Sequence, residues 1–273
     1  MWILLALSLI FLSWKKIFSL FALTAVLIIA TFQGFIILPT LGILIVIFCI
    51  AFLHWYYDNE RIIFVITEIL LLITVVALFF HLIPGFNNPK ILDKVLIGEH
   101  STLFSMYFNL DKSLVTFVLF FTIPTLFLTK TSKNQTPSKW CVLILSVPVL
   151  LIIALLLGGL RIEHHFPAWI WQFVLANLFF VSLAEEALFR GYIQQRLDKF
   201  IGAIPALLIA SILFGLIHYQ GGYLLVIFSI LAGIIYGIAW MWSGRLWVSA
   251  FFHFGLNLIH LLFFTYPAYN PHL

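Results

Sequence analysis

Long apolar runs separated by short polar stretches alternate along almost the whole chain. A helix needs about 20 apolar residues to cross the hydrocarbon core of a bilayer. By this measure the pattern predicts an all-α fold, a polytopic bundle of transmembrane helices with about ten membrane segments. The predicted segments are Trp2–Leu12, Ile17–Ile37, Leu41–Tyr57, Ile62–Leu82, Leu114–Leu128, Cys141–Leu160, Trp169–Arg196, Ala203–His218, Tyr223–Trp242 and Leu246–Thr265.

The apolar stretch at the N-terminus precedes Lys15 and Lys16. A cleavable signal peptide has the opposite order, with its positive charges first and a small-residue cleavage site after the apolar run. We therefore expect an uncleaved first membrane segment, which at its length needs tilt or a thinner bilayer to span.

Two longer polar stretches interrupt the apolar pattern. Gly85–Asp111 is rich in turn residues and is expected to form a structured loop outside the bilayer, with an interfacial helix around Ile91–Ile97 as one option. Lys130–Lys139 is polar and basic and is expected to be a linker. It separates an N-terminal membrane region, residues 1–129, whose role the sequence does not indicate, from a C-terminal half, residues 140–265.

The basic residues near the segment ends predict the orientation of the chain. If the N-terminus lies outside and the segments alternate, ten basic residues fall on the cytoplasmic side and four on the outer side, as the positive-inside rule requires. The cytoplasmic residues are Lys15, Lys16, Arg61, Lys130, Lys133, Lys139, Arg190, Arg196, Lys199 and Arg245. The outer residues are Lys90, Lys94, Lys112 and Arg161.

The composition supports the membrane interpretation. Hydrophobic residues make up 64% of the chain and charged residues only 9%, whereas soluble domains carry about 25% charged residues. The net charge of +4 is spread over many short loops, so it indicates membrane topology, and no nucleic acid partner is expected. Cys49 and Cys141 lie in apolar stretches and predict neither a disulfide nor a thiol metal site.

Ionisable residues inside the predicted spans cost about 2.5–3.5 kcal/mol each and are usually functional or paired. The candidates considered are Glu68, His81, Glu185, Glu186, Arg190, His218, His253 and His260, and all but the first two lie in the last four spans. Glu186 and Arg190 are four residues apart and can pair on one helix face. Glu185 is rotated by about 100° and needs another partner. Alternatively, these acids lie at a helix end near the cytoplasmic surface, where water solvates their charges and they have no catalytic role.

Three further polar residues follow in later spans. His253 and Asn257 are four residues apart and point to the same helix face, while His218 ends an apolar run and is, taken alone, more typical of a packing histidine. Buried polar groups need partners, and these residues have few besides the acids. Given a helical rise of about 1.5 Å per residue, they can meet in the inner half of the bilayer only if the helices tilt or the bounds of the last two segments shift. His218 fits this arrangement least well.

The ordered motifs Glu-Glu-x-x-x-Arg at 185–190, Phe-x-x-x-His at 214–218 and His-x-x-x-Asn at 253–257 resemble the CPBP family. This family contains peptidases of the CAAX prenyl-protease type and bacteriocin-processing relatives. The resemblance covers about residues 140–265, which it makes a peptidase core, and none of the motif residues lies in residues 1–129.

The resemblance implies an intramembrane endopeptidase. Glu185 would act as general base for a water molecule, His218 would bind and polarise that water, and His253 and Asn257 would stabilise the oxyanion. Glu186 and Arg190 would support the site. The implied partners are the lipid bilayer and a membrane-anchored protein or peptide substrate, and the expected location is the inner membrane of a prokaryotic cell.

Two alternatives stay open at this point. The favoured mechanism uses no cofactor, but Glu185, His218 and His253 are also a zinc-ligand set, although the chain has no His-Glu-x-x-His motif. The second alternative concerns function: the same polar groups are compatible with a proton- or ion-coupled transporter, and the fold with a non-catalytic immunity or scaffold protein.

Overall fold

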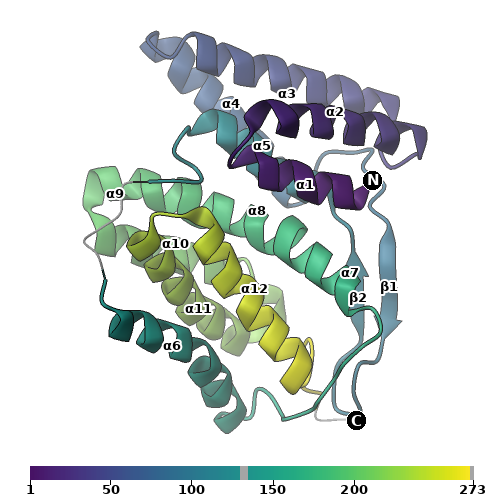
Figure 1. Ribbon diagram of the computed structural model, residues 1–273, viewed down its shortest axis with the longest axis vertical. Coiled ribbons are helices and arrows are strands. Elements are labelled where there is room, and N and C mark those ends of the chain that lie inside the picture. The colour runs from purple at the N-terminus through teal and green to yellow at the C-terminus, as the bar shows by residue number, and fades with distance from the viewer. Residues whose placement is uncertain (130–134, 271–273) are drawn as a thin grey trace.

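The computed structural model describes residues 1–129 and 135–270, and it confirms a predominantly helical bundle (Figure 1). The N-terminal half contains α1 (Trp2–Leu12), α2 (Lys16–Phe32), α3 (Leu38–Tyr56), α4 (Arg61–Phe79) and α5 (Leu110–Thr122). The C-terminal half contains α6 (Pro137–Leu156), a continuous helix over Ile170–Ile201, α10 (Ala203–Leu216), α11 (Gly222–Ser243) and α12 (Leu246–Phe263).

Six helices of the described chain are long and apolar enough to cross a membrane: α3, α4, α6, the helix Ile170–Ile201, the helix Tyr219–Ser243 that contains α11, and α12. Three shorter apolar helices, α1, α2 and α10, match three other predicted segments. The predicted bounds Leu114–Leu128 were wrong, because the corresponding helix is α5, with 13 residues. Pro124 ends it: the preceding Ile123 has extended backbone, as the steric clash with a following proline favours.

A two-stranded antiparallel sheet occupies the loop between α4 and α5. Strand β1 (Lys90–Val95) pairs with β2 (Phe104–Tyr107). The expectation of an interfacial helix around Ile91–Ile97 was therefore wrong. The β-branched Ile91 and Val95 suit a strand, and pairing with β2 satisfies backbone groups that an isolated short helix would leave exposed at its ends.

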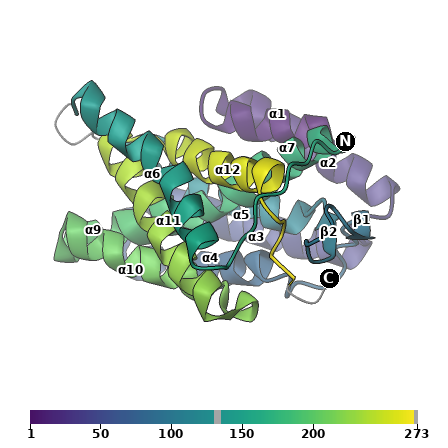
Figure 2. The same ribbon diagram turned by 90° about the horizontal axis from the view of Figure 1, so that it is seen from below.

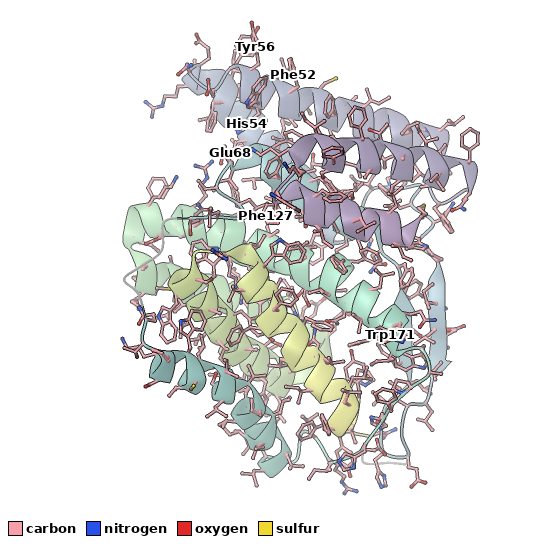
Figure 3. All side chains as sticks on the ribbon, in the orientation of Figure 1. Phe52, His54, Tyr56, Glu68, Phe127 and Trp171 are labelled. Atoms are coloured by element: carbon pink, nitrogen blue, oxygen red, sulfur yellow. The ribbon has the colours of Figure 1, made fainter. Side chains whose placement is uncertain are left out.

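The helix Ile170–Ile201 lies in the middle of the bundle. Of its most apolar 18-residue window 72% is buried inside the protein, against 22% for α3 and 28% for α4 and α6. The outer helices turn large apolar side chains away from the protein. Figure 3 shows Phe52 and Tyr56 at the margin of α3, where they are 50% and 62% exposed. Such a surface is suited to lipid and not to water.

The two halves of the chain share one hydrophobic core. Buried residues from Leu5 in α1 to Leu261 in α12 belong to a single contiguous cluster. Helix α5 is buried on nearly all sides and packs against α3, α4 and the central helix. A polar contact between α4 and the central helix adds to this packing: Glu68 of α4 accepts hydrogen bonds from Tyr192 and Arg196.

Four isolated β-bridges agree with the predicted alternation of segments. Ile36 with Phe86, Ser101 with Tyr269, and Ile162 with Phe264 each join two stretches predicted on the outer side. Leu128 with Arg245 joins two stretches predicted on the cytoplasmic side. Figures 1 and 2 accordingly place the sheet and both labelled ends of the chain at one end of the bundle and α9 (Gln195–Ile201) at the other.

Two basic residues were wrongly counted as loop charges. Arg190 is fully buried in the central helix, and the Lys112 side chain is only 13% exposed. Without these two residues, nine basic residues are predicted on the cytoplasmic side and three on the outer side. The excess of positive charge on the cytoplasmic side therefore remains. Lys130 and Lys133 lie outside the described residues, and the predicted linker ends early because Pro137 begins α6.

We predict that the start of α6 and the turn after α9 face the cytoplasm. Lys139→Cys and Lys199→Cys, each in a chain whose exposed Cys49 and Cys141 are replaced by Ser, should resist a membrane-impermeant maleimide applied to intact cells. Lys90→Cys in β1 is the matched control and should be labelled. If Lys139→Cys and Lys199→Cys were labelled and Lys90→Cys were not, the predicted orientation would be wrong.

Candidate active site

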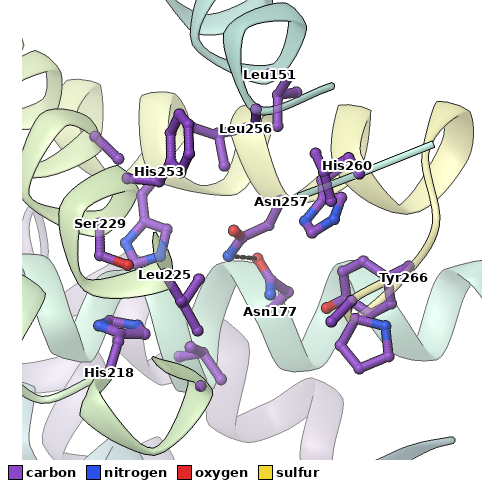
Figure 4. A pocket seen from close by; sticks show the side chains of 18 of the residues that line it. Leu151, Asn177, His218, Leu225, Ser229, His253, Leu256, Asn257, His260 and Tyr266 are labelled. Atoms are coloured by element: carbon purple, nitrogen blue, oxygen red, sulfur yellow. Dashed lines mark hydrogen bonds between the residues drawn. The ribbon is translucent and has the colours of Figure 1, made fainter. Parts of the chain in front are cut away.

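A cavity of about 980 Å³ lies between the central helix, α10, α11 and α12 (Figure 4). Four stretches that all belong to the outer-predicted end of the bundle contribute to its wall: 104–107, 158–160, Gly221 and 266–269. The cavity therefore runs from the middle of the central helix toward that end. His218 follows α10 at the end of the bundle that is predicted to lie outside, so the residues of the site meet toward that end.

All four residues predicted to carry chemistry line this cavity: Glu185, His218, His253 and Asn257. Figure 4 shows His253 and Asn257 on α12 facing His218 and Asn177 across it. Glu186 and Arg190 are not among the lining residues and lie behind the wall, both fully buried. The two adjacent acids thus point in different directions, as their rotation around the helix predicts.

The central helix is irregular around the two acids. Glu185 and Glu186 belong to the short segment α8 (Leu183–Glu186), which lies between π-helical stretches at Ala176–Ser182 and Ala187–Gln194. The first α-helical part, α7, is Ile170–Leu175. π-helical turns are rare and are frequent at functional sites, because they change the direction of the side chains that follow.

Glu185 forms an ion pair that the sequence did not predict. Its Oε1 lies 2.7 Å from Nζ of Lys112, in the first turn of α5. The ammonium group also stacks on the ring of Phe79, 4.6 Å from its centroid. The other carboxylate oxygen of Glu185, Oε2, is buried and has no hydrogen-bond partner among the described residues. One oxygen is therefore held by a cation and the other is unpaired.

His253 connects the two acids. Its Nδ1 lies 3.0 Å from Oε1 of Glu186, and its Nε2 lies 3.9 Å from Oε2 of Glu185. The imidazole stacks on Tyr236, with ring centroids 4.8 Å apart. A carboxylate at Nδ1 favours a proton on that nitrogen and holds the ring orientation, which leaves Nε2 directed toward Glu185 and the cavity.

Glu186 is the better satisfied of the two acids. Nε of Arg190 lies 3.2 Å from its Oε2, and the hydroxyl of Ser249 donates a hydrogen bond to the same oxygen. The predicted pair between Glu186 and Arg190 is confirmed. Arg190 in turn donates to the carbonyl of Gly233 at 2.9 Å. A Cβ at Gly233 would lie 3.1 Å from the guanidinium, so glycine permits this close approach.

The two remaining residues make local hydrogen bonds at the cavity wall. Nδ2 of Asn257 donates to Oδ1 of Asn177 at 3.2 Å. Nδ1 of His218 bonds the carbonyl of Phe214 at 2.9 Å, which leaves its Nε2 available to the cavity. The ring of Phe214 contacts both His218 and His253, with ring centroids 5.0 and 5.5 Å apart.

The side chains of the zinc alternative do not gather into a metal site. Among the described residues, no group of three or more His, Cys, Asp or Glu side chains is placed to hold a metal ion. The Lys112 ammonium already lies 2.7 Å from Oε1 of Glu185. Glu185, His218 and His253 in this arrangement therefore do not fit zinc coordination.

Sequence reasoning missed Lys112, Asn177, Ser249 and Tyr236. Ser249 had a usable signal, since it lies four residues before His253 and eight before Asn257, on one helix face. Asn177 is a single polar residue in an apolar stretch of the same helix as Glu185. Lys112 had no signal, because its partner is 73 residues away and in the other half of the chain.

Residues 167–259 match the family model described as type II CAAX prenyl endopeptidase, Rce1-like. This match agrees with the predicted resemblance to the CPBP family. All seven motif residues fall inside the matched range, whereas Lys112 and the sheet fall outside it. No curated protein and no solved structure matches the chain.

The buried pair predicts a stability defect for Glu186→Gln. This change leaves Arg190 charged and buried without its carboxylate, which costs about 3–5 kcal/mol in comparable buried pairs. We expect a lower folded yield and a lower midpoint of thermal unfolding in detergent. Asp93→Asn, which removes the exposed pair with Lys90, is the control and should change neither. Unchanged unfolding of Glu186→Gln would mean that the pair contributes little.

Proposed function

We propose that the protein is an intramembrane endopeptidase that hydrolyses a peptide bond of a membrane-associated protein or peptide, with Glu185 activating the attacking water. One observation carries this proposal. A buried glutamate with an unpaired oxygen faces the Nε2 of His253 beside a cavity that also contains His218 and Asn257.

In the proposed first step, Oε2 of Glu185 takes a proton from a water molecule while the water oxygen attacks the carbonyl carbon of the scissile bond. His218 is assigned to holding this water through Nε2. The carbonyl π-bond becomes a C–O⁻ group, and a tetrahedral intermediate results. In the second step Glu185 returns the proton to the amide nitrogen, the C–N bond breaks, and an acid and an amine leave.

The oxyanion is assigned to His253 and Asn257. Glu186 accepts a hydrogen bond from Nδ1 of His253 and holds the ring, and the proposed role of His253 is to donate from Nε2 in its doubly protonated form. Asn257 uses one amide proton toward Asn177 and has a second to donate. Such donors stabilise developing charge more strongly in a protected cavity than in water.

We assign the mechanism to the metal-free class. Lys112 places a positive charge 2.7 Å from Glu185, and this charge repels a divalent cation from the carboxylate. The same ammonium group supports the base role. A buried carboxylate needs a counter-charge, and the Lys112 ammonium supplies it to Glu185. Lys112 is thus a positioning residue contributed by the N-terminal half.

The proposed substrate is a protein or peptide already held by the membrane, because the cavity lies within a bundle whose outer helices face lipid. The protein is an integral membrane protein with several spans, and the inner membrane of a prokaryotic cell remains our prediction for its location.

The test is cleavage of single-span reporter proteins in proteoliposomes. The reporter panel varies the residues near the membrane boundary and includes one prenylated CAAX peptide. For a reporter that the parent protein cleaves, Glu185→Gln should lower the rate by at least about 10²-fold, because it keeps the shape and removes the base. Folding is followed separately by gel filtration.

Two outcomes would overturn this mechanism. Normal cleavage by folded Glu185→Gln would remove the base role, and a proton or ion flux lost in that variant would favour a transporter. One zinc ion bound per chain, whose removal by a chelator abolishes cleavage and whose return restores it, would replace the metal-free assignment.

Two substitutions of Lys112, to Met and to Arg, test whether this lysine supports cleavage or inhibits it. Lys112→Met removes the counter-charge of the buried Glu185 and should lower cleavage by about 10-fold or more. Lys112→Arg keeps the charge and should retain most of the activity. Faster cleavage by Lys112→Met at every pH would instead mean that the lysine restrains the enzyme.

A further inference from the structure

One backbone edge of strand β2 borders the cavity. Its four consecutive residues, Phe104 to Tyr107, all line the cavity, whereas β1 contributes none. Side chains of a strand alternate between two faces, so a face would present only every second residue. The cavity therefore borders the backbone edge of β2 that lies opposite β1. Figures 1 and 2 show β1 at the margin of the molecule and β2 on its inner side.

This edge has no backbone partner within the described chain. The sheet has two strands, and residues 103–107 make no backbone hydrogen bond outside their pairing with β1. Immediately before β2 the same stretch does accept a second extended segment: the amide of Thr102 donates to Ala268 at 3.0 Å, and the amide of Asn270 donates to His100 at 2.9 Å. The backbone here is thus already shaped for antiparallel addition.

A substrate inside the membrane needs such an edge. A membrane-spanning helix satisfies its own backbone groups, and unwinding it to expose a peptide bond leaves donors and acceptors that hydrocarbon cannot bind. A strand edge replaces those hydrogen bonds and holds the peptide extended, which is the principle of β-strand addition. At about 3.3 Å per residue, β2 can hold a peptide segment of about four residues.

We propose that the substrate polypeptide binds as an added strand along the free edge of β2, with its scissile bond continuing toward Glu185. This inference rests on the proposed function and specifies how its substrate is held. The occupant is an unwound segment of a membrane-anchored polypeptide. Recognition by the backbone makes few demands on sequence, so the side-chain pockets of the cavity would select among substrates.

Disulfide cross-linking tests the geometry. The protein carries Ser105→Cys and Glu185→Gln, with Cys49 and Cys141 replaced by Ser. The probes are versions of the cleaved single-span reporter with one cysteine moved through the residues flanking the cleavage site. Cα atoms of paired strands lie about 4.5–5.5 Å apart, within the disulfide range. Cross-links should therefore form at every second reporter position.

Asp93→Cys in β1 is the matched control, because its strand borders no part of the cavity, and it should cross-link at no position. A period of three to four reporter positions at Ser105→Cys would mean that the substrate docks as a helix. The absence of cross-links with a reporter that the parent protein cleaves would also overturn the proposal. Cross-linking needs no turnover, so these results are independent of whether Glu185 is the base.

A backbone variant gives a second readout. Ser105 is the β2 position without a register partner in β1, and its hydroxyl accepts a hydrogen bond from the amide of Lys94. Ser105→Pro removes an amide donor and should raise KM for the reporter by about 10-fold, the upper range for one hydrogen bond. Ser105→Ala keeps the amide donor and loses the hydroxyl alone, so it should raise KM much less than Ser105→Pro does. Equal KM values for both variants would contradict strand addition.

Discussion

Two neighbouring carboxylates in one apolar helix impose the constraint on which the rest of the structure depends. Ionised groups in a low-dielectric interior need counter-charges and hydrogen bonds. Each acid obtains its partner from a different direction: Glu186 from Arg190, one turn along the same helix, and Glu185 from Lys112 in α5. Helices α11 and α12 pack around the pair of Glu186 and Arg190. Helix α5 must reach the middle of the helix Ile170–Ile201 to place Lys112 beside Glu185.

This division assigns different work to two residues of one type. Glu186 has three polar partners within the protein, Arg190, Ser249 and His253, and it orients the histidine. Glu185 keeps one oxygen without a hydrogen bond from the described chain, beside the cavity. A group that is fully satisfied has little left to offer a reactant, whereas an unpaired acceptor next to a cavity can take a proton. The difference in partners, more than the difference in position, favours Glu185 as the base.

The sequence predicted those features that depend on local spacing. The membrane helices, the pair of Glu186 with Arg190, and the common face of His253 and Asn257 follow from apolar length and from separations of four residues. It did not predict contacts between distant segments. Lys112 was assigned to the outer side because it lies between the polar stretch Gly85–Asp111 and the predicted span Leu114–Leu128. The sheet was missed because paired strands need a partner that single-segment patterns do not reveal.

The N-terminal half consequently contributes to the proposed catalytic site, although the family match begins at residue 167. It supplies the cation at Glu185, and its loop supplies the strand edge at the cavity. Asp111, beside Lys112, is bonded by His81 and Asn88, which fixes the start of α5 relative to α4 and the loop. Displacing this junction would withdraw the lysine and leave Glu185 buried without a counter-charge. The charge balance of the site therefore couples residues 1–129 to the matched region more tightly than shared apolar packing alone would.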